Sequence, residues 1–535
     1  MKIMGKKLFG LVKYKPSDAI QTILESPKAA DTFAQLLDKK NQSIEKSKTK
    51  AQTILSELTS SYSFNALSLS YWIVRGLQKS MFDGIVIHGK GLDAAREISK
   101  QGKILFFLPN HKSHMDYLLI SYILFNHNIA PPHIAAGVNL SFWPMGPIFR
   151  KTGAYFIRRK ISGNFLYTKL LELYFSWMLR HKISQEFYME GGRSRDGKIR
   201  EVQSGVFTLF AEQAIEQKLA SQIYIIPTTI TYDRVPEMQS LLEELKGSSK
   251  KKESVFSLFA SLSKLVTKHG NTHLHFGEPL AFDSLVQGEF TKKTFQNLSK
   301  DLFTRIQKQK ALTLPGMLAL ILLSRDEEMS SNDVLQRMLQ LIKLSKPFQN
   351  FMSDSFVNAQ KSWDHVLQKY ASYGWFEKKY EHLFIQKSKR IEMNYYKNDV
   401  IPFLIPFSLR VFEKALPTSE FLIVQNIIQH EFPYAEHAPQ TASLEMEDFL
   451  QMIHVPMFAL YREILKLAIQ NSWASLTSSE THMDWKKILE DKDFAYPEMI
   501  TTEAIRSTAM FFHQHADVWK NDTASISNAL EKMLS

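Results

Sequence analysis

Between residue 84 and about residue 280, the chain alternates short apolar runs with longer segments of helical periodicity. Helical spacing of apolar residues marks 117–127, 166–181 and 206–217. Such alternation is typical of a sheet covered by helices, and it constrains the fold more than any other feature. We therefore predict an α/β layer in this stretch. Its strand-like runs are GIVIHG, KILFFLP, HIAAGV, GAYFIRR, QEFYME, IYIIPTTITYD and THLHFGEP.

The chain on either side of this layer has a helical pattern. Residues 17–82 place apolar residues three and four positions apart. Beyond about residue 290, strand-like runs nearly vanish, and amphipathic segments such as Ser331–Leu344 and Phe449–Asn471 replace them. We predict an N-terminal helical region at 1–82, an α/β domain at 83–290 and a mainly helical C-terminal region at 291–535.

The composition is that of a globular protein, with 44% apolar residues and 37 Phe. The absence of cysteine excludes disulfide bonds, iron–sulfur clusters, cysteine-ligated zinc and a thioester formed on the protein. Lys and Arg number 66 against 54 Asp and Glu, which gives a net charge of +12. This balance favours an anionic partner, but charge alone does not choose among a phosphorylated substrate, acidic lipid and nucleic acid.

Two segments bear on membrane contact. The most apolar window, Leu314–Ser324, is far shorter than the roughly 18 residues that a spanning helix needs. Residues 1–15 hold five lysines but lack the apolar core and cleavage site of a signal peptide. These lysines interleave with apolar residues such as Leu8 and Phe9, a pattern that suits an interfacial anchor and almost equally a frayed, soluble terminus.

The strongest local feature is the run PNHKSHMD at residues 109–116, between a strand-like run and a helical one. This order would place His111 and Asp116 at the carboxyl end of a sheet strand, where open α/β folds bind ligands. A carboxylate near a histidine can hold the imidazole in one tautomer, so that the free nitrogen accepts a proton from a hydroxyl. The pair therefore indicates acid–base chemistry.

The same His-x4-Asp spacing occurs a second time, at His88 and Asp93, in a chain with 17 histidines. We interpret this second copy as a decoy, because it lacks unusual polar neighbours such as Asn110 and Ser113. The alternative for the first copy is that Asn110 and Ser113 merely cap a helix and that His111 is an ordinary surface residue.

Two basic segments follow strand-like runs. Residues 150–160 carry five positive charges and no acid, which suits either bidentate capture of a phosphate or a solvated strand end. Residues 187–198, FYMEGGRSRDGK, run into a glycine-rich basic turn. This turn is not a P-loop, because Ile199 stands where Ser or Thr is needed. It indicates an anion-binding turn with Glu190 at its entrance, or else a hairpin with exposed charges.

Metal and nucleophile sites find little support, since neither G-x-S-x-G nor H-E-x-x-H occurs. His273 and His275 alternate on a strand-like run, where packed or exposed side chains are commoner than metal ligands. We expect no cofactor and no metal. Pro227 lies inside a strand-like run, which favours an edge, a bulge or a lining position.

Four segments together resemble a known family. NHKSHMDYLL, GAYFIRR, FYMEGGRSRDGK and IIPTTITYD occur in this order within about 125 residues, and they are similar to the four motif blocks of the glycerolipid acyltransferases. More narrowly, they resemble the membrane-associated bacterial glycerol-3-phosphate 1-O-acyltransferases. The likeness continues through FGEPLAF and ALILLSRDEEMSSNDVL to MNYYKNDVIPFLIPFSL, and so covers most of residues 80–420. It implies a central mixed sheet flanked by helices.

The resemblance also implies a reaction and its residues. His111, activated by Asp116, would take the proton from the sn-1 hydroxyl of glycerol 3-phosphate. The oxygen would attack an acyl thioester, either acyl-CoA or acyl-carrier protein, without an acyl-enzyme, to give lysophosphatidic acid in the first step of phospholipid synthesis. Backbone N–H groups after Asn110 would bind the oxyanion. Pro227 would border the acyl-donor site. The residues expected around the substrate phosphate are Arg158, Arg159, Arg193, Ser194, Arg195 and Lys198, with Glu190 and Gly191 shaping the turn of the substrate-binding segment.

Because the product is an amphiphile and the chain has basic segments, we expect peripheral attachment to the anionic cytoplasmic face of the inner membrane. One alternative is that the same machinery acylates dihydroxyacetone phosphate or a lysophospholipid. Another is a basic nucleic-acid-binding protein, whose aromatic residues should interleave with Lys and Arg on exposed strands. Most Phe lie in apolar runs instead, so we expect no nucleic acid.

Overall fold

The computed structural model describes residues 7–40, 43–158, 161, 163–203, 205–245, 268–286, 291–324, 328–346 and 352–415, with a few positions between 425 and 435. The predicted helical segment Phe449–Asn471 lies outside these residues. The chain divides into two compact units. Met1–Arg195 and Ile199–Lys310 form the first unit, whereas Asp196–Lys198 and Ala311–Ser535 form the second. The predicted regions 1–82 and 83–290 fall in the first unit, except for Asp196–Lys198.

A mixed sheet forms the core of the first unit. Its strands are β1 (Gly84–His88), β2 (Ile104–Pro109), β3 (His133–Gly137), β4 (Ala154–Ile157), β5 (Gln185–Glu186), β6 (Ile223–Tyr232), β7 (Asn271–Phe276) and β8 (Leu280–Ala281). They follow the order β1-β7-β6-β2-β5-β3-β4, with β8 beside β6. Most neighbours are parallel, whereas β7 and β8 run antiparallel to β6. The predicted α/β fold with a central mixed sheet is therefore confirmed.

Pro227 lies where β6 changes partners. Tyr224 and Ile225 pair with β8, whereas Thr228–Tyr232 pair with β7. A proline has no N–H to donate, so the junction between two partner strands tolerates it. The Pro227 carbonyl accepts a hydrogen bond from the Gly277 N–H at 2.8 Å. The proline is thus accommodated in the interior of a long strand.

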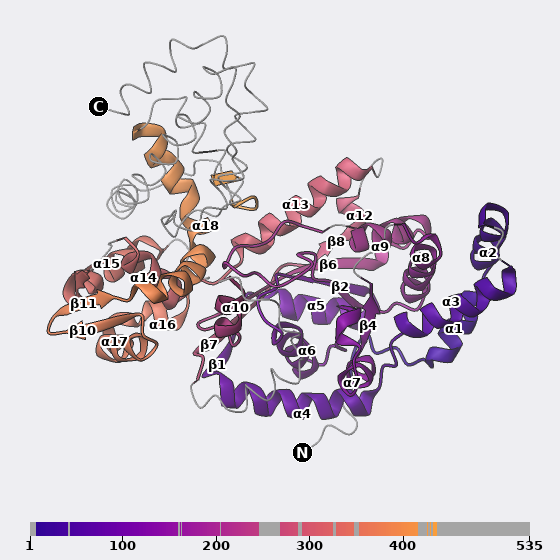
Figure 1. The fold of residues 1–535 in the computed structure, drawn as a ribbon, viewed down its shortest axis with the longest axis horizontal. Helices are drawn as coiled ribbons and strands as arrows, with labels where there is room; N and C mark the ends of the chain where they lie inside the picture. Colours follow the sequence, from indigo (N-terminus) through magenta and orange to yellow (C-terminus); the bar gives the residue numbers. More distant parts are fainter. Residues whose placement is uncertain are drawn as a thin grey trace, which may run out of the picture. The chain divides into compact units, whose positions relative to one another are not determined.

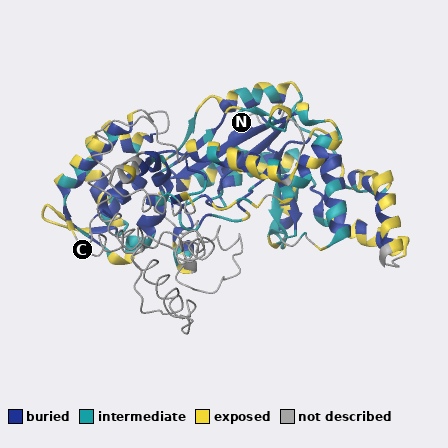
Figure 2. Ribbon diagram, turned by 90° about the horizontal axis from the view of Figure 1, so that it is seen from above, coloured by how far each residue is buried: buried dark blue, intermediate teal, exposed yellow. Residues whose placement is uncertain are grey.

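Helices surround this sheet (Figure 1). They are α1 (Pro16–Leu24), α2 (Pro27–Lys40), α3 (Ile44–Leu58), α4 (Phe64–Met81), α5 (Gly91–Lys100), α6 (Asp116–Asn126), α7 (Met145–Lys151), α8 (Phe165–Arg180), α9 (Gly205–Glu216), α10 (Met238–Leu245), α12 (Phe282–Leu285) and α13 (Lys292–Lys308). Every residue of β2 is buried, so both faces of the sheet are covered. Figure 2 shows the strands among the most buried parts of the molecule.

Aromatic side chains tie this layer together. Phe106 of β2 packs against Phe207 and Phe210 of α9, with ring centroids 5.0 and 4.9 Å apart. Phe207 in turn packs against Phe295 of α13 at 5.0 Å. Rings at these distances bury large apolar surfaces and add roughly 0.5–1.5 kcal/mol per pair. The central strand that leads to His111 is therefore packed on aromatic rings of α9.

The N-terminal segment joins the same core. Leu8 is buried with Leu67 and Phe125, and the Phe9 N–H donates to the Asn128 carbonyl at 2.8 Å. An interfacial anchor needs its apolar side chains exposed to lipid. The expectation that Leu8 contributes to such an anchor is therefore wrong.

The second unit combines helices with a small antiparallel sheet. Its helices are α14 (Leu314–Leu322), α15 (Ser331–Leu344), α16 (Asp354–Val357), α17 (Trp363–Ser372) and α18 (Arg390–Ala415), and its strands β9 (Glu328–Ser330), β10 (Phe376–Lys379) and β11 (His382–Ile385). The predicted helix Ser331–Leu344 coincides with α15. The apolar run Leu314–Ser324 is α14 and its end, wholly buried and packed against α18. Within the described ranges, no helix is both long and apolar enough to cross a bilayer.

Candidate active site

The turn after β2 is fixed to the neighbouring strand by an asparagine. Asn110 Oδ1 accepts a hydrogen bond from the Ile230 N–H at 2.7 Å, and Asn110 Nδ2 donates to the Ile230 carbonyl at 3.1 Å. Asn110 is buried, so this amide pair replaces the last rung that a strand would have made with β6. The chain therefore leaves the sheet at a defined point, immediately before His111.

His111 and Asp116 form the expected pair. Nδ1 of His111 lies 2.8 Å from Oδ2 of Asp116. Because a carboxylate accepts, Nδ1 carries the proton and Nε2 is left as an acceptor. Asp116 is fully buried, whereas the His111 side chain keeps 13% of its surface exposed. The free nitrogen thus belongs to the group that a substrate can reach.

The surroundings of His111 favour a neutral imidazole. Burial lowers the pKa of His111, opposed by its hydrogen bond to Asp116 and by the charge of that carboxylate. The positive charge of Arg193 lowers it further. A histidine that is neutral near pH 7 is in the state that a general base requires.

Two residues that sequence reasoning missed complete this geometry. The Tyr232 hydroxyl donates to Oδ1 of Asp116 at 2.7 Å. Glu237 accepts from the Ser113 hydroxyl at 2.6 Å and from the His114 N–H at 2.9 Å. Tyr232 ends the run IYIIPTTITY. The sequence could have indicated it, because a polar side chain at the end of a strand that neighbours β2 can reach the residues that follow β2. Glu237 lies in no recognisable motif, so the sequence offered no signal for it.

The backbone of the turn is saturated with hydrogen bonds. Every N–H from Asn110 to Asp116 has an acceptor. The acceptors, in order, are the Thr228 carbonyl, Glu190, Asp116 for Lys112 and Ser113, Glu237, the Ser113 hydroxyl and the Ser113 carbonyl. In this conformation these N–H groups cannot also bind an oxyanion, so the expectation that they do so is not met.

Glu190 joins the turn to the glycine-rich loop. Its Oε1 accepts from the His111 N–H at 2.7 Å and its Oε2 from the Arg200 N–H at 2.9 Å. Burial raises the pKa of Glu190 to about 7. Gly191 follows with φ +64°, a conformation that L side chains rarely adopt. Both oxygens of Glu190 therefore hold the backbone on the two sides of the loop.

Arg193 and Ser194 lie beside the His111 turn. The Ser194 N–H donates to the His111 carbonyl at 2.8 Å. The Ser194 hydroxyl is buried and has no hydrogen-bond partner among the described residues. Nη1 of Arg193 lies 3.9 Å from Oε1 of Glu237, and its side chain is 10% exposed. A cation and an unpaired hydroxyl thus stand next to the base.

The remaining basic residues are placed differently. Arg158 donates to Glu57 of α3 through two nitrogens of its guanidinium, with Nε–Oε1 at 3.0 Å and Nη2–Oε2 at 2.6 Å. Arg159 lies outside the described residues. Arg195 belongs to the first unit, at the point where the chain passes into the second unit. Lys198 belongs to the second unit, and its Nζ lies 5.0 Å from the centroid of the Phe432 ring. The structure therefore brings Arg193 and Ser194 to His111, and it shows Arg158 in a different ion pair.

The second His-x4-Asp copy forms no such pair. His88 Nε2 lies 3.2 Å from Nδ1 of His273, and its ring also stacks with that of His275. Asp93 lies in the first turn of α5. In the part of the chain that the structure describes, no three His, Asp or Glu side chains converge to hold a metal ion.

A buried carboxyl lies behind the base. The Tyr188 ring packs on the His111 ring, with centroids 4.3 Å apart, and its hydroxyl donates to Oε1 of Glu186 at 2.7 Å. Burial is the main cause that raises the pKa of Glu186 to about 8. Glu186 is therefore largely protonated at neutral pH, and it adds little negative charge beside His111.

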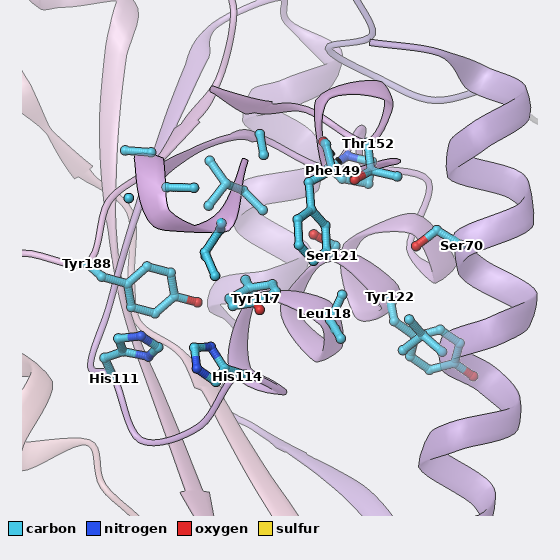
Figure 3. Close-up of a pocket in the computed structure, with 18 of the residues that line it drawn as sticks. Ser70, His111, His114, Tyr117, Leu118, Ser121, Tyr122, Phe149, Thr152 and Tyr188 are labelled. Carbon is cyan, nitrogen blue, oxygen red and sulfur yellow. Dashed lines mark hydrogen bonds between the residues drawn. The ribbon is translucent and has the colours of Figure 1, made fainter. Parts of the chain in front are cut away.

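A cavity of about 240 Å³ opens beside His111. Figure 3 shows His111, His114 and Tyr188 at one end of it, with Tyr117, Leu118 and Tyr122 of α6 and Phe149 of α7 along its length. Its wall is mostly apolar and comes from α4, α6, β3 and α7. The other apolar lining residues are Leu67, Val74, Phe125, Pro131, Ile134, Ala135, Ala136, Leu140 and Ala154. An elongated apolar group can therefore lie against α6 while its polar end reaches His111. Pro227 does not line this cavity.

Comparison with known proteins supports the same family. Residues 92–231 match the acyltransferase family model, and residues 242–452 match the glycerol-3-phosphate acyltransferase C-terminal region. Proteins named glycerol-3-phosphate acyltransferase from Haemophilus ducreyi and Glaesserella parasuis are both 29% identical, over 73% and 71% of this chain and 50% and 49% of their own lengths. One of the same name from Shewanella frigidimarina is 31% identical, over 68% of this chain and 47% of its own.

The chain spans about half the length of the curated relatives it matches. Its His111–Asp116 pair, Arg193 and Ser194 all lie within the matched acyltransferase region. The fold, the paired acid–base residues and both family models agree. The chain therefore belongs to the glycerolipid acyltransferase family, with an acyltransferase domain followed by a glycerol-3-phosphate acyltransferase C-terminal region.

Proposed function

We propose that this protein transfers an acyl group from acyl-CoA or acyl-carrier protein to the sn-1 hydroxyl of glycerol 3-phosphate, giving lysophosphatidic acid. The observation that carries the proposal is His111, held by Asp116 at the end of an apolar cavity, where burial lowers the pKa of the imidazole. The relatives named glycerol-3-phosphate acyltransferase support this choice of acceptor. The α/β region at 83–290 would be the catalytic part.

The reaction follows from the geometry of the base. Nε2 of His111 takes the hydroxyl proton as the oxygen attacks the thioester carbonyl, and Asp116 stabilises the imidazolium that forms. The tetrahedral intermediate then expels the thiolate, which receives that proton from His111. The new bond is an oxygen ester and the broken bond is carbon–sulfur, so the enzyme itself is not acylated.

The developing oxyanion needs a donor outside the saturated turn. Tyr117, one residue beyond Asp116, lines the cavity, and its hydroxyl is buried without a hydrogen-bond partner among the described residues. We assign it as the candidate donor. A buried hydroxyl left unpaired costs free energy, which a bound carbonyl oxygen would recover.

The phosphate would bind on the side of the Gly191 loop. Arg193 supplies a guanidinium and Ser194 an unpaired hydroxyl, both next to the base. Charge-assisted hydrogen bonds of this kind position a phosphate and select for it. Arg158, Arg159, Arg195 and Lys198 remain proposed phosphate ligands on the strength of the family pattern.

The acyl chain would occupy the cavity along α6. Burial of each methylene contributes about 0.8 kcal/mol, so an apolar cavity gives the donor both affinity and a length preference. Pro227 would stay near the thioester end, because it pairs with Leu108, three residues before His111. We further propose peripheral attachment to the cytoplasmic face of the inner membrane, where the amphiphilic product is released.

A purified-protein assay tests these assignments. Glycerol 3-phosphate is offered with acyl-CoA and acyl-carrier-protein donors, and both thiol release and the position of the ester are followed. We expect His111→Ala to lower kcat by about 10²- to 10⁴-fold and Asp116→Asn to remove most activity. His88→Ala is the matched control, because His88 shares the spacing but packs against His273.

Three results would contradict the proposal. One is an essential His88 with a dispensable His111 in folded protein. A second is ester formation at another hydroxyl, or a clear preference for dihydroxyacetone phosphate or a lysophospholipid in competition. The third is salt-sensitive binding of RNA without any thiol release.

A further inference from the structure

Large apolar side chains are exposed on two neighbouring segments of the first unit. On α4 these are Leu69, Trp72 and Ile73, exposed by 62%, 46% and 52%. In the stretch that contains α7 they are Trp143 and Ile148, exposed by 84% and 49%. These five make up more than half of the exposed large apolar residues among the described positions. We call Leu69, Trp72, Ile73, Trp143 and Ile148 the apolar face.

The α4 helix is apolar on two sides. Leu67, Val74 and Met81 recur every seven residues and are buried. Leu69, Trp72 and Ile73 lie three and four residues apart, so they share a second stripe that faces outward. A surface helix of a soluble domain normally presents polar residues there. The outward stripe therefore marks contact with something apolar.

The two segments lie side by side. The Ser63 N–H, at the start of α4, donates to the Lys151 carbonyl at 2.9 Å, and the Ser61 N–H donates to the Arg150 carbonyl at 3.1 Å. Helices α4 and α7 also pack against each other, as both ribbons show at the bottom of Figure 1. The five side chains of the apolar face are thus carried by one joined surface.

The two segments that carry the apolar face are basic. Neither 64–81 nor 138–152 contains an Asp or Glu. Arg75 lies 5.2 Å from the centroid of the Trp72 ring, and Lys79 and Lys151 are exposed. Tryptophan beside Lys and Arg is the composition of surfaces that sit at the boundary between anionic headgroups and acyl chains.

The same two segments also form the wall of the cavity. Leu67, Tyr71 and Val74 of α4 line it, as do Phe149 and Thr152. On α4, the cavity-lining residues and the residues of the apolar face therefore occupy opposite sides of the helix. An acyl chain held beside α6 would be one helix away from a membrane that covered the apolar face.

We propose that the apolar face rests on an anionic bilayer, with Trp72 and Trp143 in the headgroup boundary and Arg75, Lys79 and Lys151 against lipid phosphates. This places the proposed acyl-chain cavity next to lipid, and in that respect it rests on the proposed function. The product would then pass into the bilayer close to α4, without crossing bulk water.

Vesicle co-sedimentation of the full chain tests this surface. Vesicles of phosphatidylcholine with and without phosphatidylglycerol are used at low and high salt, with no substrate present. We expect binding to the anionic vesicles that falls as salt rises. The double variant Trp72→Gln/Trp143→Gln should bind about ten- to a hundredfold more weakly, because two large side chains no longer reach lipid.

The matched control is Val357→Gln/Tyr380→Gln. These residues are exposed by 44% and 95%, belong to the second unit and are not part of the apolar face, so this variant should bind as the unsubstituted chain does. Equal unfolding midpoints for both variants establish that the substitutions spare the fold. A wild-type-like affinity of the Trp double variant overturns the proposal. So does a self-associated chain that the Trp substitutions convert to monomer, because a second copy would then cover the face.

Failure here can be told apart from failure of the catalytic proposal. Vesicle binding is measured without acyl donor or acceptor, so it does not depend on acyl transfer. A chain that binds vesicles through the apolar face and lacks acyltransferase activity would contradict only the proposed function. A chain that acylates glycerol 3-phosphate but does not bind anionic vesicles would contradict the membrane surface and the proposed peripheral attachment, but not the proposed acyl transfer.

Discussion

Replacing Tyr232 with Phe removes one atom that holds the acid–base pair. The hydroxyl donates to Oδ1 of Asp116 at 2.7 Å, and both residues are buried. Hydrogen bonds to charged groups contribute about 1.5–3 kcal/mol. We therefore expect the free energy of unfolding to fall by about that amount.

Tyr155 offers a matched comparison. It is a fully buried tyrosine of the same sheet, and its hydroxyl has no hydrogen-bond partner among the described residues. Removing an unpaired buried hydroxyl relieves a desolvation cost, so Tyr155→Phe should be neutral or slightly stabilising. The difference between the two variants isolates the bond to Asp116 from the general effect of losing a hydroxyl.

Urea unfolding followed by tryptophan fluorescence measures this difference as a shift in midpoint at unchanged slope. A second readout is the acid limb of the pH profile of kcat/KM. With one donor fewer, the Asp116 carboxylate attracts a proton more strongly and raises the pKa of His111, so the limb should move to higher pH. Equal stability losses in both variants, or an unshifted acid limb in Tyr232→Phe, would refute this account of Asp116.

Other expectations concern the cavity, the phosphate and a buried acid. Ser121→Phe should narrow the cavity one turn of α6 beyond Tyr117. If four methylenes of a long acyl donor lose their binding site, the lost stabilisation is roughly 3 kcal/mol, and kcat/KM for that donor falls about 200-fold. Short donors should keep their kcat/KM, and an unchanged dependence on chain length would contradict this. Arg193→Ala should raise KM for glycerol 3-phosphate about ten- to a hundredfold and KM for the acyl donor much less. Arg158→Ala should raise KM for glycerol 3-phosphate by a smaller factor, because Arg158 already binds Glu57. The reverse order of the two variants would mean that the phosphate binds nearer to Arg158. The pKa of Glu186 is raised from 4.5 to about 8, so between these pH values the folded protein keeps a proton that the unfolded chain loses. The free energy of unfolding should therefore fall as the pH rises from about 4.5 to 8. Glu186→Gln should make this free energy depend less on pH, as urea unfolding at several pH values would show.

The fold could be predicted in outline because its strands are short apolar runs between clear helical patterns. β2, β6 and β7 lie where the pattern put them, whereas the run QEFYME forms a ladder only at Gln185 and Glu186. The chain turns away there because the residues that follow build the loop around Glu190. The small sheet of β9, β10 and β11 was missed, since runs of three or four residues carry too little periodicity to detect.

The candidate site divides in the same way. His111 and Asp116 could be found because both lie in one contiguous turn of unusual composition. Tyr232 and Glu237 reach Asp116 and Ser113 only through the pairing of β6 with β2, a contact between residues more than a hundred positions apart. The ion pair of Arg158 with Glu57 likewise depends on how α3 packs, which no local pattern encodes.

The fully bonded backbone of the turn from Asn110 to Asp116 has a consequence for how this chemistry can be altered. The shape of the turn is complete before any substrate arrives, so binding does not have to order a loop. Four side chains maintain that shape through hydrogen bonds within the protein: Asn110, Glu190, Tyr232 and Glu237. Grafting His111 and Asp116 onto another scaffold would therefore fail unless these four supporting residues were included. Much of what positions the base therefore lies in side chains outside the His111–Asp116 pair.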